Sequence, residues 1–198
     1  LPQVQGMTYA HNEENLYLAM YADTSTSLKI AGTDLAINQT TDYPNDGRIK
    51  ISLNPKKPSS FKVHLRIPTW AGNQFVPGKL YKYLNQKKES WSLTVNGSKS
   101  QAKVEKGFAI IERKWKKGDQ IILDLPMPLR VNQCDKRVEE NHNRLAFTRG
   151  PFVLCAEEID NGGATQRFFL NQEKMETKYS LAKVKLPSGS FSQVKTMA

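Results

Sequence analysis

Apolar and polar residues alternate along most of this chain, in short runs that are separated by residues typical of turns. In FKVHLRIP, residues 61–68, the apolar residues from Phe61 to Ile67 fall on one face of an extended strand, and the polar residues, His64 among them, fall on the other. Further strands are predicted in residues 15–22, 27–32, 34–43, 48–55, 92–95, 108–115, 120–126 and 144–160. No long segment has the 3.6-residue period of a helix, so the sequence predicts an all-β, antiparallel β-sandwich with little helix.

Two hairpins are predicted where turn residues separate two strands. Asn96-Gly97 joins residues 92–95 to a polar return strand, and this dipeptide is the one most typical of a two-residue hairpin turn. The segment KKGD, residues 116–119, would join the strands at 108–115 and 120–126 in a second hairpin.

The composition changes after about residue 131. Residues 132–144, NQCDKRVEENHNR, are polar and charged, which is typical of a linker or a long surface loop. We therefore expect a β-sandwich in residues 1–131, and in residues 132–198 a linker with further strands of an incomplete C-terminal β domain. Because the chain starts at Leu1 rather than at a methionine, we also expect it to be a piece of a longer protein.

The net charge of +10 raises the question of a nucleic-acid partner. Most of the basic residues are lysines, and Lys50, Lys62 and Lys114 stand singly at polar positions of predicted strands. This scatter is typical of solvated strand faces and protected sheet edges, so we expect no nucleic-acid partner. No apolar run approaches the roughly 20 residues that span a bilayer, so we expect no membrane partner.

The sequence offers no self-contained catalytic site. Each pair of acidic residues, such as Glu139 with Glu140, is adjacent in the chain, so it cannot form the converging acid and base of a glycoside hydrolase. The histidines, His11, His64 and His142, are far apart and in polar settings. No motif for a phosphate loop, a dinucleotide or a serine nucleophile is present. We therefore predict no catalytic residue and no cofactor-binding residue in this chain.

Cys134 and Cys155 are the two cysteines of the chain, and no further ligands lie at the spacing of a zinc module. We therefore predict no metal site. Cys155 lies in the apolar stretch FVLCAE, where a cysteine usually serves as a small buried residue. A disulfide between the two cysteines depends on their distance in the fold, which the sequence leaves open.

Three aromatic residues are candidates for contact with a sugar or with a protein partner. Trp70 lies on a loop after a strand-ending proline, Trp91 starts a strand beside charged residues, and Tyr81 lies in a short alternating stretch. Because a tryptophan left in water forgoes roughly a few kcal/mol of burial, we favour a capping role for Trp70 over a sugar contact. Trp115, in a strand of apolar residues, is predicted to lie in the core or half-buried.

Several motifs taken in order are more specific than any one of them. LRIPTWA at 65–71, WKKGD at 115–119, DLPMPLR at 124–130 and RGPFVLCAE at 149–157 together resemble the region downstream of the catalytic barrel in glycoside hydrolase family 127, the β-L-arabinofuranosidase type. In that family an (α/α)6 barrel carries the chemistry, with a zinc-bound cysteine as nucleophile and a glutamate as acid/base. Neither Cys134 nor Cys155 matches that motif, so no catalytic or zinc-binding position carries over to this chain.

The resemblance, which covers about residues 9–163, implies a β-sandwich region that braces the barrel of a parent enzyme and takes part in dimer contacts. The expected partners are the helical barrel, a second copy of the chain and, as a ligand, a plant-type glycan. The chain alone is expected to be inactive and without a cofactor, because the zinc of the parent family lies in the barrel. The alternative interpretation is a stand-alone carbohydrate-binding module that uses Trp70, Trp91 and Tyr81 for stacking.

Overall fold

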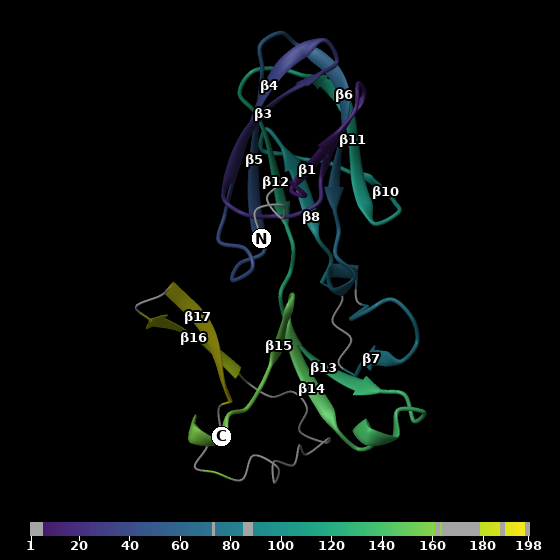
Figure 1. The fold of residues 1–198 in the computed structure, drawn as a ribbon, viewed down its shortest axis with the longest axis vertical. Helices are drawn as coiled ribbons and strands as arrows, with labels where there is room; N and C mark the ends of the chain where they lie inside the picture. Colours follow the sequence, from purple (N-terminus) through teal and green to yellow (C-terminus); the bar gives the residue numbers. More distant parts are fainter. Residues whose placement is uncertain are drawn as a thin grey trace. The chain divides into compact units, whose positions relative to one another are not determined.

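The computed structural model describes residues 6–72, 74–84, 89–160, 163, 179–186 and 189–196 (Figure 1). It divides into two compact units, Leu1–Phe152 and Val153–Ala198, and each unit is considered by itself. The chain is 53% strand and 6% helix, which confirms the predicted all-β class. Among the described residues no helix has the length and apolar character that crossing a membrane requires.

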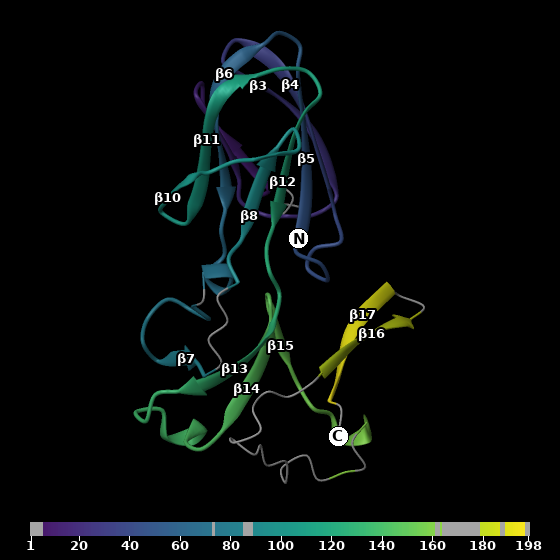
Figure 2. The ribbon, with the colours of Figure 1, turned by 180° about the vertical axis from the view of Figure 1, so that it is seen from behind.

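The first unit contains a sandwich of two sheets, which face each other in Figures 1 and 2. The first sheet has the order β1-β2-β6-β11-β10 and consists of β1 (Tyr9–His11), β2 (Asn15–Leu18), β6 (Ser59–Arg66), β11 (Phe108–Trp115) and β10 (Lys103–Glu105). The second has the order β3-β4-β5-β12-β8-β9 and consists of β3 (Thr24–Ile30), β4 (Thr33–Thr41), β5 (Arg48–Pro55), β12 (Asp119–Asp124), β8 (Ser92–Val95) and β9 (Ser98–Lys99). Among the described residues of these two sheets, neighbouring strands are antiparallel except β2 and β6, which are parallel.

The core lies between these two sheets, where alternate residues of each strand point inward. The largest fully buried side chain is Trp115 at the end of β11, whose exposed fraction is 0%. Its Nε1–H group donates a hydrogen bond of 2.9 Å to the backbone oxygen of Phe61 in β6, so the indole is buried with its polar atom satisfied. The prediction that Trp115 lies in the core is confirmed. The same core cluster contains aliphatic residues from both sheets, among them Leu16, Ile37, Ile51 and Ile121.

The predicted hairpin between residues 108–115 and 120–126 is wrong, because the two strands belong to opposite sheets. β11 pairs with β6 and β10, and β12 pairs with β5 and β8, so neither strand has a free edge for the other. The Asp119 carboxylate organises the crossing: it accepts a hydrogen bond of 2.9 Å from the amide of Lys116 and one of 2.8 Å from the side-chain amide of Asn96. Apolar alternation is the same in both arrangements, so it cannot distinguish a hairpin from a crossing between sheets.

The hairpin at Asn96-Gly97 is confirmed, and two hairpins that the sequence did not predict have the same kind of turn. Asn96 and Gly97 have φ angles of 51° and 79°, as a primed turn requires. The turns Ala31-Gly32, between β3 and β4, and Lys106-Gly107, between β10 and β11, have the same positive φ at both positions. Alanine and lysine rarely occupy such a position, so these two turns carry a weaker sequence signal than Asn-Gly.

A third sheet in the order β15-β14-β13-β7 follows the sandwich and consists of β7 (Tyr81–Tyr83), β13 (Leu129–Cys134), β14 (Leu145–Arg149) and β15 (Phe152–Leu154). The single strand predicted at residues 144–160 is therefore two strands, separated by a turn at Gly150 and Pro151. Residue 131, the predicted domain boundary, lies within β13. The part of the chain that the structure describes contains three short 3-10 helices, η1 (Thr69–Gly72), η2 (Glu139–Asn141) and η3 (Glu158–Asp160). The second unit also holds the hairpin of β16 (Tyr179–Leu186) and β17 (Gly189–Thr196).

One glycine fixes how closely the start of β5 approaches the end of β12. The amide of Leu125 donates a hydrogen bond of 2.9 Å to the backbone oxygen of Gly47. A Cβ atom on Gly47 would lie 1.8 Å from the backbone oxygen of Leu125, and no flexible side chain could move to relieve that contact. Glycine is therefore required here by the close approach of two backbones.

We predict that Gly47→Ala lowers the free energy of unfolding by about 1–3 kcal/mol, because the methyl group forces the two strand ends apart. The matched control is Gly72→Ala in η1, where an added Cβ would meet no atom within 4 Å. This control should change the free energy by no more than about 0.5 kcal/mol. Chemical denaturation of the two variants measures both values, and equal losses would contradict the proposed contact.

Candidate functional site

Trp70 and Trp91 lie at the rim of the sandwich core. Both side chains are half-buried and pack against the core cluster, Trp70 from η1 and Trp91 from the residue before β8. Each indole is held partly by the core, which leaves part of its surface accessible, and a sugar contact at either residue stays a prediction.

Tyr81 lies in β7, at the edge of the third sheet, next to two other aromatic residues. Its ring meets the ring of Phe75 edge-on, with 6.2 Å between the centroids, and Phe75 meets Tyr83 in the same way at 6.4 Å. The guanidinium of Arg130 lies over the Tyr83 ring at 5.1 Å from its centroid. Tyr81 is thus part of an aromatic group with a cation beside it, and it remains half-exposed.

Another aromatic group, which the sequence did not indicate, lies on the outer face of the first sheet. His64 stacks on Tyr17, with 4.2 Å between the ring centroids, and Phe108 meets Tyr17 edge-on at 5.6 Å. The strand pairing aligns His64 with Tyr17 on one side and with Ile110 on the other. We call Tyr17, His64, Phe108 and Ile110 the aromatic face.

His64 is buried although it has polar neighbours, because the other side chains of the aromatic face leave it only 8% exposed. Nε2 of His64 lies 2.8 Å from Oδ1 of Asn15, whose own amide nitrogen donates to Asn12. An amide oxygen only accepts, so Nε2 carries the proton. Burial lowers the pKa of His64 below its ordinary value, Lys62 lowers it further, and Glu105 opposes the shift. The ring is therefore neutral at pH 7.

The outer face of the second sheet has a different character. Its outward positions are mainly hydroxyl, amide and charged residues, such as Asn38 and Thr40 in β4 and Lys50 and Ser52 in β5. Ile122 in β12 is a half-buried apolar exception. A sheet face that meets water normally has such a composition, so the aromatic face of the first sheet is the unusual one.

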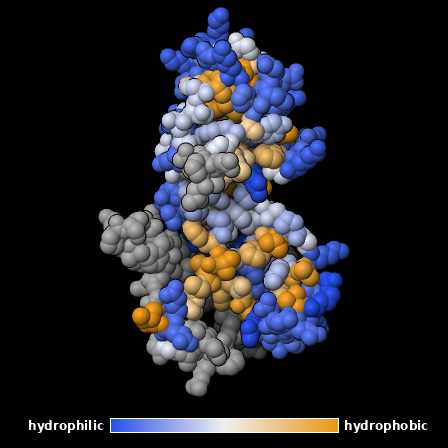
Figure 3. Space-filling model, in the orientation of Figure 1, coloured by the Kyte–Doolittle hydropathy of each residue, from blue (hydrophilic) through white to orange (hydrophobic). Residues whose placement is uncertain are grey.

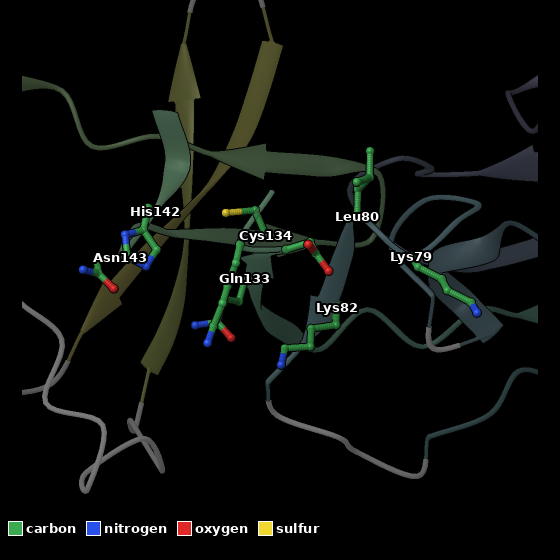
Figure 4. A pocket seen from close by; sticks show the side chains of 9 residues that line it. Lys79, Leu80, Lys82, Gln133, Cys134, His142 and Asn143 are labelled. Carbon is green, nitrogen blue, oxygen red and sulfur yellow. The ribbon is translucent and has the colours of Figure 1, made fainter. Parts of the chain in front are cut away.

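A pocket of about 370 Å³ lies at the end of the third sheet where β13 leads into the 135–144 loop (Figure 4). Gln133 and Cys134 of β13 lie between Lys82 of β7 on one side and His142 and Asn143 of the loop on the other (Figure 4). The residues that line the pocket are Lys79, Leu80, Lys82, Gln133, Cys134, Asp135, Lys136, His142 and Asn143.

Both cysteines are free thiols, so the disulfide that the sequence left open is not formed. Cys155 is exposed, and the prediction that it is a buried residue is wrong, because the stretch FVLCAE leaves the sheet after Leu154. The Cys134 thiol donates a hydrogen bond of 3.0 Å to the backbone oxygen of Asn141, across the loop that closes the pocket.

The described part of the chain contains no group of three His, Cys, Asp or Glu side chains that could hold a metal ion. The paired carboxylates are exposed: Glu139 and Glu140 lie in η2, Glu157 precedes η3, and Glu158 is the first residue of η3. No converging acid and base is therefore found among the residues described.

Comparisons with known proteins point to one family. The family described as "Beta-L-arabinofuranosidase, GH127 middle domain" matches residues 15–127, and the "Glycoside hydrolase family 127 C-terminal domain" matches residues 129–193. The chain is similar to the non-reducing end β-L-arabinofuranosidase of Bifidobacterium longum subsp. longum, with 29% identity over 132 residues, which is 65% of this chain and 18% of that protein.

Solved structures are similar over nearly the whole chain. A GH127 β-arabinofuranosidase superposes with a TM-score of 0.91 at 31% identity, over 98% of this chain and 30% of the other. A GH127 β-L-arabinofuranosidase from Geobacillus stearothermophilus T6 gives a TM-score of 0.83 at 26% identity, over 98% of this chain and 28% of the other. The chain thus spans less than a third of the length of these relatives.

The lowered pKa of His64 predicts a loss of stability in acid. Below a pH of about 6.5 the unfolded chain takes up a proton on this histidine before the folded chain does, which favours unfolding. Neutral His64 therefore contributes fully to the stability of the fold above that pH, and this contribution decreases as the pH falls toward the lower pKa that His64 has in the folded chain. Chemical denaturation at pH 7.5 and at pH 5.5 measures the free energy of unfolding, which should decrease more between these two pH values for the wild type than for His64→Gln. Equal losses in the two proteins would contradict a neutral, buried His64.

Proposed function

Since the chain belongs to glycoside hydrolase family 127 and matches its middle and C-terminal domains, we propose that it is a non-catalytic β region that braces the helical catalytic barrel of such an enzyme. The relatives named as β-arabinofuranosidase and β-L-arabinofuranosidase are more than three times as long as the part that this chain covers. The reaction of those relatives would then belong to segments that this chain does not contain.

The observation that carries the proposal is the contrast between the two outer faces of the sandwich. The second sheet presents mainly polar side chains, as a solvated face does, whereas the first presents the aromatic face. Aromatic residues that are half-buried on a sheet exterior are typical of a protein contact, where they supply most of the binding energy. We assign the barrel as the occupant of this face.

Most of the coloured surface in the view of Figure 3 is hydrophilic, and its largest apolar area lies in the lower half of the picture. The large apolar side chains that are exposed are Met7, Met20, Leu80, Val104, Val153 and Ile159. No member of this set belongs to the aromatic face, so the aromatic face is a separate feature and not one edge of a generally apolar surface.

The alternative function is a carbohydrate-binding module that stacks sugars on Trp70, Trp91 and Tyr81. The core contacts of Trp70 and Trp91 favour bracing, because a stacking platform needs one whole ring face open to the ligand. Calorimetric titration with neutral arabinose oligosaccharides separates the two functions. A bracing region should release no binding heat, whereas a module should bind these sugars without help.

We predict that the isolated chain self-associates through the aromatic face when no barrel covers it. The net charge of +10 opposes association, and salt screens that repulsion over a Debye length of about 10 Å at 0.1 M. Sedimentation velocity should therefore show association that increases with salt. The double substitution Tyr17→Ser with Phe108→Ser should reduce it about tenfold, because it removes two aromatic contacts.

Ile122→Ser is the matched control, since Ile122 is a half-buried apolar residue on the outer face of the second sheet. It should associate as the wild type does. Circular dichroism of each variant verifies that the fold is retained. A chain that stays monomeric at high salt and high concentration would refute an uncovered contact face, and equal effects of the two substitutions would refute its assignment to the first sheet.

A further inference from the structure

The pocket of the third sheet carries an excess of positive charge. Lys79, Lys82 and Lys136 line it, and all three side chains are exposed. Within the described residues no ion pair involves any of these three lysines. Three ammonium groups around one concavity repel one another, and a bound anion would relieve that repulsion.

Asp135 is the one acidic residue that lines the pocket, and its carboxylate is paired with a cation that lies outside the pocket lining. Its carboxylate accepts hydrogen bonds of 2.8 Å from Nε and 3.1 Å from the backbone amide of Arg137, which does not line the pocket. This contact lowers the pKa of Asp135 below its usual value, so the carboxylate stays ionised and paired with Arg137. The charge of Lys82 lowers the same pKa without forming an ion pair, so three lysines face one carboxylate and the pocket keeps a net positive charge for a ligand.

The other lining groups are suited to hydroxyl groups. Gln133 and Asn143 carry side-chain amides that both donate and accept, and His142 adds a ring nitrogen from the same loop. Leu80 contributes an apolar wall and is 46% exposed. The Cys134 thiol bonds to the backbone of Asn141, so it braces the loop. Cations, amides and one apolar wall together match a ligand with carboxylates, hydroxyls and a nonpolar ring face.

We infer that this pocket binds a sugar acid, that is, a uronic acid residue within an oligosaccharide. The carboxylate would meet the lysines and the hydroxyls would meet the amides, as charge-assisted and neutral hydrogen bonds respectively. The anionic part of the inference follows from the charge of the pocket, while the choice of a sugar over another anion rests on the proposed function in a glycoside hydrolase. The volume of about 370 Å³ holds one or two sugar rings.

Isothermal titration of the whole chain with trigalacturonate tests the inference. Binding should be measurable at low salt and should weaken as salt is added. The variant Lys82→Gln with Lys136→Gln should bind about tenfold more weakly, because each ammonium supplies a charge-assisted contact. The control variant, Lys50→Gln with Lys99→Gln, loses the same charge from the strands β5 and β9 of the sandwich and should bind as the wild type does.

Inorganic phosphate and neutral arabinotriose are the two comparison ligands. Phosphate that binds as tightly as trigalacturonate would contradict the assignment to a sugar acid. No binding of trigalacturonate, or equal effects of the two lysine variants, would contradict the pocket as the binding site. Arabinotriose binding at Trp70 or Trp91, lost on their substitution, would contradict the bracing function and leave the pocket assignment intact. The two proposals therefore fail on different results.

Discussion

The passage of the chain from one sheet to the other at residues 116–118 is the constraint on which the sandwich depends. At its start Trp115 is completely buried and bonded through Nε1 to the backbone of Phe61, and at its end Asp119 holds the amide of Lys116. The indole therefore anchors β11 to β6, while Asp119 directs β12 into the opposite sheet. Because these two strands lie in opposite sheets, the apolar face of each strand is buried in the space between the sheets.

The local pattern predicts the strands well and their pairing poorly. Alternation places the inward residues of β5 and β12 correctly, because a one-residue slip would expose every apolar side chain. It cannot predict which strands become neighbours, and the expected hairpin around residues 116–119 fails for that reason. The sequence could not predict the buried state of His64 either. A histidine that shares a strand face with Lys62 and Arg66 looks solvated until the fold brings Tyr17 and Phe108 to it from other strands.

The candidate sites differ in how far the sequence could indicate them. The proline before Trp70 marks this residue as a candidate on a loop, although only the fold shows that its ring packs against the core. The pocket could not be predicted, because Lys82 and Lys136 are more than fifty positions apart and meet only when β7 pairs with β13. The aromatic face and the pocket lie in different sheets, so a contact with a barrel and a contact with a ligand need not compete.

The central claim is that the aromatic face of the first sheet is a protein contact surface and the outer face of the second sheet is solvated. Hydroxyl-radical footprinting of the chain, read residue by residue by mass spectrometry, tests it under dilute low-salt and concentrated high-salt conditions. The account predicts that oxidation of Tyr17 and Phe108 falls in the associated state while that of Ile122 is unchanged. Protection of Ile122 with no change at Tyr17 and Phe108 would contradict it.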